Sequence, residues 1–277
     1  TRLQFRPMKR LFRLLIPLFA MTTPLQAQLI VAHRGASHDA PENTVAAFNL
    51  AWEQNADAVE GDFYLTRDGK IACIHDKTTK KTAGKEIKVA DATLAELQKL
   101  EYGAWKHAKY KGEPLPTLAD ALKTVPAGKK IFIEIKCGPE IVPALKAALK
   151  KSSLKPEQTI VIAFDEDVIA AVKKTIPGIK AFWLTSFKLD AKSGKWTPSV
   201  GSILGTLKKI KADGLDCKAE PKVVNKAFVK KIRAAGMELH CWTINDPKLA
   251  RKIQKLGFDS ITTDRPAFLR KALAKTP

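Results

Sequence analysis

A chain of 277 residues with 45% hydrophobic residues can bury a large core, and this composition excludes an intrinsically disordered protein. The 48 lysines and arginines against 28 acidic residues give a formal net charge of +20, a field that attracts anions such as phosphate compounds, nucleic acid or a membrane surface. Because most lysines fall in helix-like patterns, as at Lys146, Lys150 and Lys151, a solvated basic surface explains most of this charge.

The first 27 residues have the pattern of an export signal. From Met8, basic residues precede an apolar run, Leu14 to Met21, and small and polar residues follow as far as Ala27. This order is typical of a secretory signal peptide cleaved near Ala27, with residues 1–7 as a short extension before Met8. The run is shorter than the ~20 residues of a membrane span, and an uncleaved tether is the alternative. We therefore expect an exported, periplasmic or secreted protein without stable membrane insertion, folded over residues 28–277.

Short apolar runs recur along the rest of the chain, and helix-like stretches separate most of them. The runs are Leu29–Ala32, Ala58–Leu65, Ile71–Ile74, Ile131–Ile135, Thr159–Phe164, Lys180–Leu184, Gly214–Asp216, Met237–Trp242 and Ser260–Thr263. About eight alternations of strand and helix predict a parallel sheet. At this length a closed (β/α)8 TIM barrel is favoured over an open sheet. The interval 77–116 is longer than a normal connection and contains its own helix-like stretch, so we interpret it as an insertion after the second strand.

The four cysteines show no paired spacing of the kind that binds metals. Cys73, Cys137, Cys217 and Cys241 all lie within or just after strand-like runs. This position favours buried free thiols, which behave as small hydrophobic groups. A disulfide between Cys217 and Cys241 is the alternative in an oxidising compartment.

Two predicted strands carry acidic residues on a face that should be apolar. Glu60 and Asp62 point the same way, because residues two apart share a face of a strand, and Glu134 and Lys136 likewise face inward. Charges inside a barrel are costly unless they are paired or bind a metal, and active sites form at the C-terminal ends of barrel strands. Carboxylates without a cysteine or histidine cluster suit Mg²⁺ or Ca²⁺ better than zinc. Structural ion pairs at the barrel mouth are the alternative.

Two histidines lie at predicted strand ends near these charges. His33 closes the first strand beside Arg34, and His75 follows the third apolar run. Two imidazoles beside carboxylates and basic groups suggest an acid–base pair around a bound anion, whereas each alone would more often be a packing residue. His240 shares a strand face with Trp242, so it either lines the pocket or packs in the core.

Seven motifs, HRG, PENT, EGD, HD, EIK, WTIN and TDRP, occur in the order and approximate spacing of the glycerophosphodiester phosphodiesterase family. The chain resembles this family from Leu29 to about Leu273. The resemblance implies a TIM barrel with a small insertion after the second strand, and metal-dependent hydrolysis of glycerophosphodiesters to sn-glycerol 3-phosphate and an alcohol. The residues it implies are His33 and His75 as the acid–base pair, Glu60, Asp62 and Glu134 as ligands of one divalent cation, Mg²⁺ or Ca²⁺, and Arg34 and Lys136 as phosphate contacts.

Other residues of these motifs have supporting roles in this interpretation. Trp242 is a candidate substrate contact. Glu42 either orients the arginine of HRG or a histidine, or caps the following helix. Asn43 or Thr44 is the candidate N-cap of that helix, and Gly35 lets the backbone turn tightly past the ligand.

Three alternatives fit parts of the pattern. A related barrel phosphodiesterase acting on lysophospholipid or phosphoinositide head groups would reuse the histidines, and Trp105 and Tyr110 leave room for a longer apolar mouth. A non-catalytic anion-binding protein would have lost a histidine or carboxylate, and none is lost. The charge alone suggests nucleic-acid binding, but no recognised motif supports it, so we expect a small-molecule substrate. The sequence leaves open which histidine is the acid, and whether water or a glycerol hydroxyl attacks.

Overall fold

The computed structural model describes residues 28–274, so the predicted signal peptide lies outside the described residues. Within them, eight parallel strands form a barrel: β1 (Leu29–Ala32), β2 (Ala58–Leu65), β4 (Lys130–Ile135), β5 (Thr159–Ala163), β6 (Lys180–Thr185), β9 (Gly214–Lys218), β10 (Glu238–Trp242) and β11 (Ser260–Thr263). The barrel is closed, because β1 is hydrogen-bonded to both β2 and β11. This architecture confirms the predicted (β/α)8 barrel.

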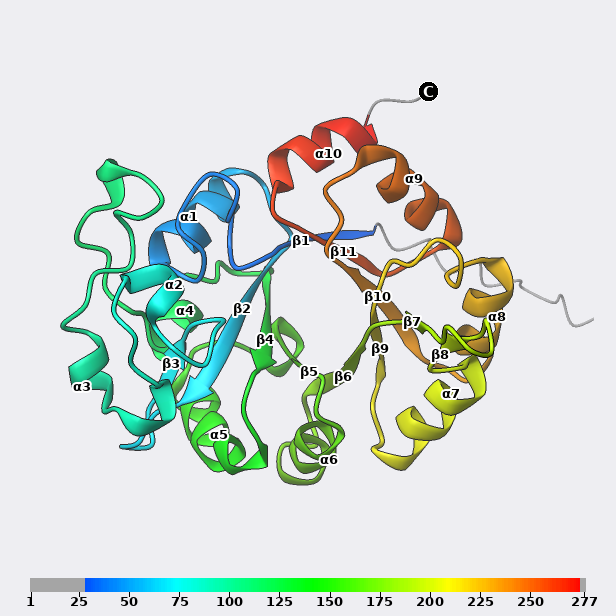
Figure 1. Ribbon diagram of the computed structural model, residues 1–277, viewed down its shortest axis with the longest axis horizontal. Helices are drawn as coiled ribbons and strands as arrows, with labels where there is room; N and C mark the ends of the chain where they lie inside the picture. The colour runs from blue at the N-terminus through cyan, green and yellow to red at the C-terminus, as the bar shows by residue number, and fades with distance from the viewer. Residues whose placement is uncertain (1–27, 275–277) are drawn as a thin grey trace, which may run out of the picture.

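A helix outside the barrel follows each of these strands (Figure 1). These helices are α1 (Val45–Glu53), α4 (Leu118–Lys123), α5 (Val142–Lys151), α6 (Glu166–Thr175), α7 (Val200–Lys209), α8 (Lys226–Ala234), α9 (Pro247–Leu256) and α10 (Pro266–Ala274). The ends of α9 show how local sequence sets the bounds. The Asp246 side chain accepts a hydrogen bond from the Leu249 amide, Pro247 opens the helix, and Gly257 ends it at a left-handed φ of 80°.

The two faces of the barrel strands separate as the alternation predicts. Val59 and Ile133 point outward into the core between strands and helices. Phe132, Ile162 and Phe182 point inward and fill the barrel. Because the barrel interior is packed with apolar side chains, the inward polar residues of the site gather near the mouth.

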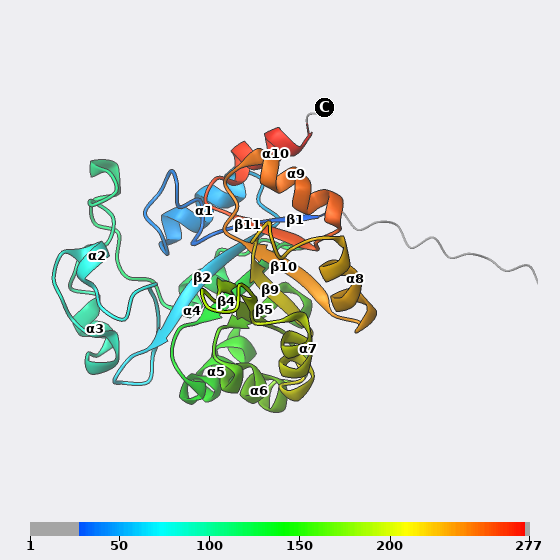
Figure 2. The ribbon, with the colours of Figure 1, turned by 45° about the vertical axis from the view of Figure 1, so that its right-hand side comes forward.

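The run at 71–74 is not a barrel strand. Its residues form β3 (Ile71–Cys73), which pairs antiparallel with the end of β2 as a hairpin. The segment after this hairpin contains α2 (Lys80–Ala83) and α3 (Leu94–Leu97), with a small apolar core of its own. It projects beyond the ring of helices on the side of α1 (Figures 1 and 2).

The cysteines are free thiols, and Cys73, Cys217 and Cys241 are buried as predicted, whereas Cys137 is only half-buried. Cys217 and Cys241 are register neighbours on β9 and β10 and form no disulfide. Within residues 28–274, no helix has the length and apolar character needed to cross a bilayer.

Candidate active site

The structure brings the predicted site residues together at the carboxyl ends of the barrel strands. They surround a cavity of about 110 Å³ at the barrel mouth. Its lining includes His33, Arg34, Glu60, His75, Glu134, Lys136 and Trp242. Asp62 is fully buried and contacts Arg34 of this lining, and Glu42 also contacts Arg34.

The carboxylates of Glu60, Asp62 and Glu134 form a cluster that could hold one metal ion. Asp62 on β2 is the register partner of Glu134 on β4, and all three residues offer oxygens within 4.8 Å of one another. Glu60 Oε1 and Asp62 Oδ1 are buried without a hydrogen-bond partner. Burial, followed by the charges of Asp62 and Glu134, raises the pKa of Glu60 well above its ordinary value. Burial and the charge of Asp62 raise the pKa of Glu134 to about 7. Unsatisfied oxygens that repel one another fit a hard divalent cation.

Arg34 and Lys136 place positive charge against this cluster. Arg34 Nε lies 3.1 Å from Asp62 Oδ2, and its backbone N–H donates to Glu60 Oε2 at 2.9 Å. Lys136 Nζ donates to Glu134 Oε1 at 2.7 Å and lies 3.5 Å from Asp62 Oδ1. Burial alone would raise the pKa of Asp62, but Arg34 and Lys136 hold it below its ordinary value. Both cations also line the cavity, where a phosphate would meet them.

Glu42 orients Arg34, which is one of the two roles predicted for it. Arg34 donates from a terminal guanidinium nitrogen to Glu42 Oε1 at 3.0 Å. Lys81 of the insertion donates to both oxygens of the same carboxylate, at 2.8 and 2.9 Å. The insertion therefore helps to fix the guanidinium through Glu42.

The turn between β1 and α1 holds a residue whose main role the sequence did not reveal. Thr44 is the helix N-cap, accepting from the Ala47 amide at 3.1 Å. Asn43 instead binds Asp62 twice, by donating from Nδ2 at 2.8 Å and accepting the Asp62 amide at 3.0 Å. Gly35 is required because a Cβ there would lie 2.5 Å from the Ala47 carbonyl carbon. Gly35 also adopts a left-handed φ of 78°, so it forms the predicted tight turn, and its close approach is to α1.

His33 is oriented by a carboxylate from the far end of the chain. Its Nδ1 lies 2.6 Å from Oδ1 of Asp264, which follows β11. Burial alone would raise the pKa of Asp264, but hydrogen bonds from His33, Asn245 and Ser37 lower it to about 2. An ionised Asp264 holds a proton on Nδ1 of His33 and leaves Nε2 to face the cavity. Sequence reasoning gave Asp264 no role, although the TDRP motif contains it.

His75 lines the same cavity and follows the β2–β3 hairpin. Its Nδ1 lies 2.6 Å from Asp76 Oδ1. Burial, with the charges of Arg34 and Lys136, lowers the pKa of His75, although Asp62 and Asp76 act in the opposite direction. The lowered pKa keeps this imidazole neutral near pH 7, as a proton acceptor must be.

Trp242, which was predicted as a substrate contact, lines the cavity, and so does Asp216, to which the sequence assigned no role. Trp242 packs edge-to-face against Phe164 with ring centroids 5.6 Å apart, and Phe164 is 46% exposed at the mouth. Asp216 is buried, and burial followed by the charge of Glu134 raises its pKa well above the ordinary value. His240 does not line the cavity, because it stacks on Phe182 inside the barrel with a centroid distance of 4.1 Å.

A second group of potential ligands lies toward the amino ends of β10 and β11. Glu238, His240 and Asp259 also offer atoms within 4.8 Å of one another. Both carboxylates are already paired, Glu238 with Lys180 at 2.5 Å and Asp259 with Arg233 at 2.8 Å. Since these ion pairs neutralise the cluster, the carboxylates at the mouth are the better cation site.

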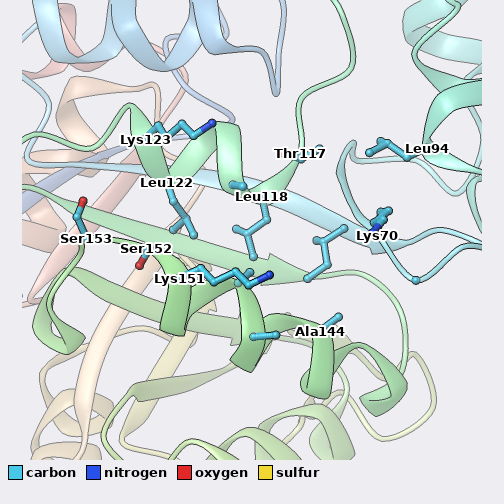
Figure 3. Close-up of a pocket in the computed structure, with 15 residues that line it drawn as sticks. Lys70, Leu94, Thr117, Leu118, Leu122, Lys123, Ala144, Lys151, Ser152 and Ser153 are labelled. Carbon is cyan, nitrogen blue, oxygen red and sulfur yellow. The ribbon is translucent and has the colours of Figure 1, made fainter.

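A larger cavity of about 540 Å³ lies outside the barrel, between α4, α5 and the β2–β3 hairpin (Figure 3). Leu118, Leu122 and Ala144 form its apolar floor, and Lys70 and Lys151 lie at its rim (Figure 3). Its lining contains no histidine or carboxylate, so it has no group for acid–base chemistry at neutral pH.

Comparison with known proteins assigns the family. Residues 33–268 match the model of the glycerophosphoryl diester phosphodiesterase family. The relative YhdW of Bacillus subtilis is 33% identical, over 87% of this chain and 96% of its own length. A glycerophosphodiester phosphodiesterase of Caldanaerobacter subterraneus is 31% identical, over 89% of this chain and 98% of its own. A solved Oleispira antarctica phosphodiesterase in complex with the product sn-glycerol-3-phosphate is 28% identical, with a TM-score of 0.79 and coverage of 89% and 97% of the two chains. The chain therefore belongs to the glycerophosphoryl diester phosphodiesterase family.

Proposed function

We propose that this protein is a metal-dependent phosphodiesterase that hydrolyses glycerophosphodiesters to sn-glycerol 3-phosphate and an alcohol. The observation that carries the proposal is the meeting of three buried carboxylates and two carboxylate-bound histidines at one cavity. Such a site can hold a phosphate between positive charges and move protons on either side of the phosphorus. The product bound to the similar Oleispira antarctica phosphodiesterase supports a small phosphate compound as the substrate here.

Negative charge develops on the phosphoryl oxygens during the reaction, and the site neutralises it. Glu60, Asp62 and Glu134 would hold one Mg²⁺ or Ca²⁺ ion, and the chemistry that such an ion supplies is stabilisation of this charge. Arg34 and Lys136 add two fixed positive charges at the same cavity. Both cations are anchored by carboxylates, so they need little rearrangement when the charge develops.

The two histidines carry the proton transfers. The lowered pKa of His75 favours it as the base. His75 accepts the proton of the attacking oxygen while that oxygen bonds to phosphorus. The bond between phosphorus and the alcohol oxygen breaks, and His33 donates its proton to that oxygen. Asp264, which lies 2.6 Å from Nδ1 of His33, holds the imidazole in place for this transfer.

A head-group panel tests this function. Purified protein is incubated with diesters of glycerol 3-phosphate that carry choline, ethanolamine, inositol or glycerol, and with the corresponding lysophospholipids. Released sn-glycerol 3-phosphate is measured by a coupled dehydrogenase assay for the glycerophosphodiesters, and the released head-group alcohol is measured for the lysophospholipids, with EDTA and with Mg²⁺ or Ca²⁺ added back. We expect release that EDTA abolishes and either cation restores. Full turnover in metal-stripped protein contradicts the metal assignment, and absence of release from every glycerophosphodiester contradicts the function.

We also propose that residues 1–27 direct export and are removed near Ala27. The basic, apolar and small-residue order of this segment supports the proposal. Mass spectrometry of the protein recovered from cell fractions should find a mature N-terminus at or close to Gln28. An intact segment in the recovered protein contradicts cleavage.

A further inference from the structure

Asp216 stands across the barrel from the carboxylate cluster. It lies on β9, which three strands separate from β2 in either direction around the barrel. Its side chain lines the same cavity as Glu60 and Glu134 and is only 1% exposed. The side chain is therefore inside the substrate cavity, at a position where bulk water barely reaches it.

One oxygen of the Asp216 carboxylate has no hydrogen-bond partner among the described residues. Its Oδ1 is buried without a hydrogen-bond partner, and Trp242 Nε1 donates to the backbone oxygen of Asp216, at 3.3 Å, not to the side chain. Ile162 and Leu184, which line the cavity with it, are apolar, and the charge that acts on Asp216 is another carboxylate, Glu134. A buried unpaired carboxylate destabilises a protein, so this arrangement calls for a partner that the substrate brings.

The charges and the size of the cavity limit which chemical group of the substrate can bind Asp216. A phosphate is excluded because it is an anion, and Asp216 lies outside the cluster that could hold one metal ion. The partner must therefore be a hydrogen-bond donor on a part of the substrate away from the phosphate. A cavity of about 110 Å³ is well below the ~300 Å³ of a drug-sized site, so the group that enters is small. A glycerol moiety has this size, with hydroxyls for Asp216 and carbon atoms for Ile162 and Leu184.

We propose that Asp216 accepts a hydrogen bond from a glycerol hydroxyl and thereby selects glycerophosphodiesters over diesters that carry a plain alkyl group in its place. The proposal rests on the proposed function, and it assigns Asp216 a role in specificity. Because the glycerol occupies the inner part of the cavity, the head-group alcohol lies toward the mouth, beside Phe164 and Trp242.

A matched pair of ligands tests the hydrogen bond without catalysis. Calorimetry compares sn-glycerol 3-phosphate with n-propyl phosphate, which has the same carbon chain and no hydroxyls, in protein with Mg²⁺ present. Wild-type protein should prefer sn-glycerol 3-phosphate. Asp216→Leu should lower the affinity for sn-glycerol 3-phosphate by roughly 10–100-fold, whereas its affinity for n-propyl phosphate should be equal to or higher than that of the wild type. Asp216→Asn keeps an acceptor oxygen, so its affinity for sn-glycerol 3-phosphate should lie between those of the wild type and Asp216→Leu. Glu220→Gln, an acid just beyond β9 and outside the cavity, is the control and should change neither affinity.

Two further measurements separate the explanations. If the role of Asp216 were structural, the unfolding temperature of the ligand-free variants would fall, and the affinities for both ligands would fall together. This result would overturn the proposal. We expect equal or higher stability, because the substitutions remove an unpaired buried carboxylate. If the Asp216 variants lost only the binding of phosphoethanolamine, Asp216 would bind an ammonium head group, and the assignment to a hydroxyl would be wrong.

The kinetic arm distinguishes this proposal from the proposed function. It compares kcat/KM for glycerophosphocholine with that for ethyl nitrophenyl phosphate. If wild-type protein hydrolyses glycerophosphocholine and Asp216→Leu keeps the same preference, the role of Asp216 is refuted while the function stands. If wild-type protein hydrolyses no glycerophosphodiester, the function fails, and the calorimetric comparison still decides whether Asp216 recognises a hydroxyl.

Discussion

Replacing Asp264 with asparagine should weaken both catalysis and the fold, because this carboxylate lies 2.6 Å from Nδ1 of His33. Asp264 also accepts hydrogen bonds from Ser37 at 3.2 Å and from Asn245 at 2.6 Å. An asparagine side chain has one acceptor oxygen and one amide donor, so it must point a donor at one of these donors. The variant therefore loses the charge and at least one hydrogen bond while keeping its shape.

The lowered pKa of Asp264 gives the magnitude of the free energy that Asp264→Asn should lose. Burial would raise it, but the three hydrogen bonds lower it from 3.8 to about 2. This lowering of the pKa corresponds to ~2.4 kcal/mol. Because 31% of the side chain is exposed, solvent screening reduces this contribution to about 1–2 kcal/mol. If the same free energy holds the His33 imidazole in its reactive orientation, kcat should fall ~5–30-fold in Asp264→Asn.

The stabilisation should depend on pH in a direction that the lowered pKa fixes. A depressed carboxyl pKa contributes stability that is complete above the unfolded value, near 3.8, and is lost as the pH falls toward 2. Urea unfolding of wild type and Asp264→Asn should therefore differ by about 1–2 kcal/mol at neutral pH, and the difference should shrink below about pH 4. Asp39→Asn, which affects the exposed His38, is the matched control and should keep wild-type kcat. A pH-independent stability difference, or an unchanged kcat in Asp264→Asn, would refute the reasoning.

Four more substitutions test the rest of the site. Glu60→Gln should weaken Mg²⁺ or Ca²⁺ binding in calorimetry without lowering the unfolding temperature of the metal-free protein, because it removes one of three carboxylates that repel one another; Glu238→Gln should leave cation binding unchanged. Arg34→Lys should lower kcat/KM roughly 10–100-fold, because a lysine cannot contact Asp62, Glu42 and a phosphate together, and wild-type kinetics would place the phosphate elsewhere. His33→Ala and His75→Ala should each lower kcat at least ~10²-fold, and His38→Ala should not. With a nitrophenyl diester, whose departure needs no proton, His33→Ala should recover much of its activity and His75→Ala should not; the reverse result exchanges acid and base.

The barrel could be predicted because its signals are local. Alternation within eight residues places Glu60 and Asp62 on the inward face, and the structure agrees. The observed strands differ from the predicted runs where backbone pairing, and not hydropathy, sets the end of a strand. For example, β9 continues to Lys218 because Cys217 and Lys218 pair with β10. The run at 71–74 joined a hairpin because Gly69 adopts a left-handed φ of 71° in the turn before it.

The missed partners depend on contacts that no local pattern encodes. Asp264 is 231 residues from His33 in the chain, so their hydrogen bond follows only from the pairing of β1 with β11. Asn43 has a side chain typical of helix caps, and only the position of Asp62 shows that it binds a carboxylate instead. Asp216 ended a predicted strand, which is where barrel sites form, but without a motif it could not be distinguished from a surface acid.

The turn between β1 and α1 explains why recognisable motifs cover part of this site and not all of it. Arg34 and Asn43 both adopt left-handed backbone conformations, with φ of 55° and 59°, which cost on the order of 1 kcal/mol each for residues other than glycine. This conformation lets Arg34 contact Glu60 through its backbone and Asp62 through its side chain, and it lets Asn43 bind Asp62 twice. Hydrogen bonds to charged groups contribute about 1.5–3 kcal/mol each, which offsets the strain only while the carboxylates are in place. The segments HRG and PENT therefore depend on the acidic residues of β2, so few other residues can replace them. Within residues 28–274 the Oδ1 atom of Asp216 has no hydrogen-bond partner, and under our proposal the substrate sets the identity of this residue.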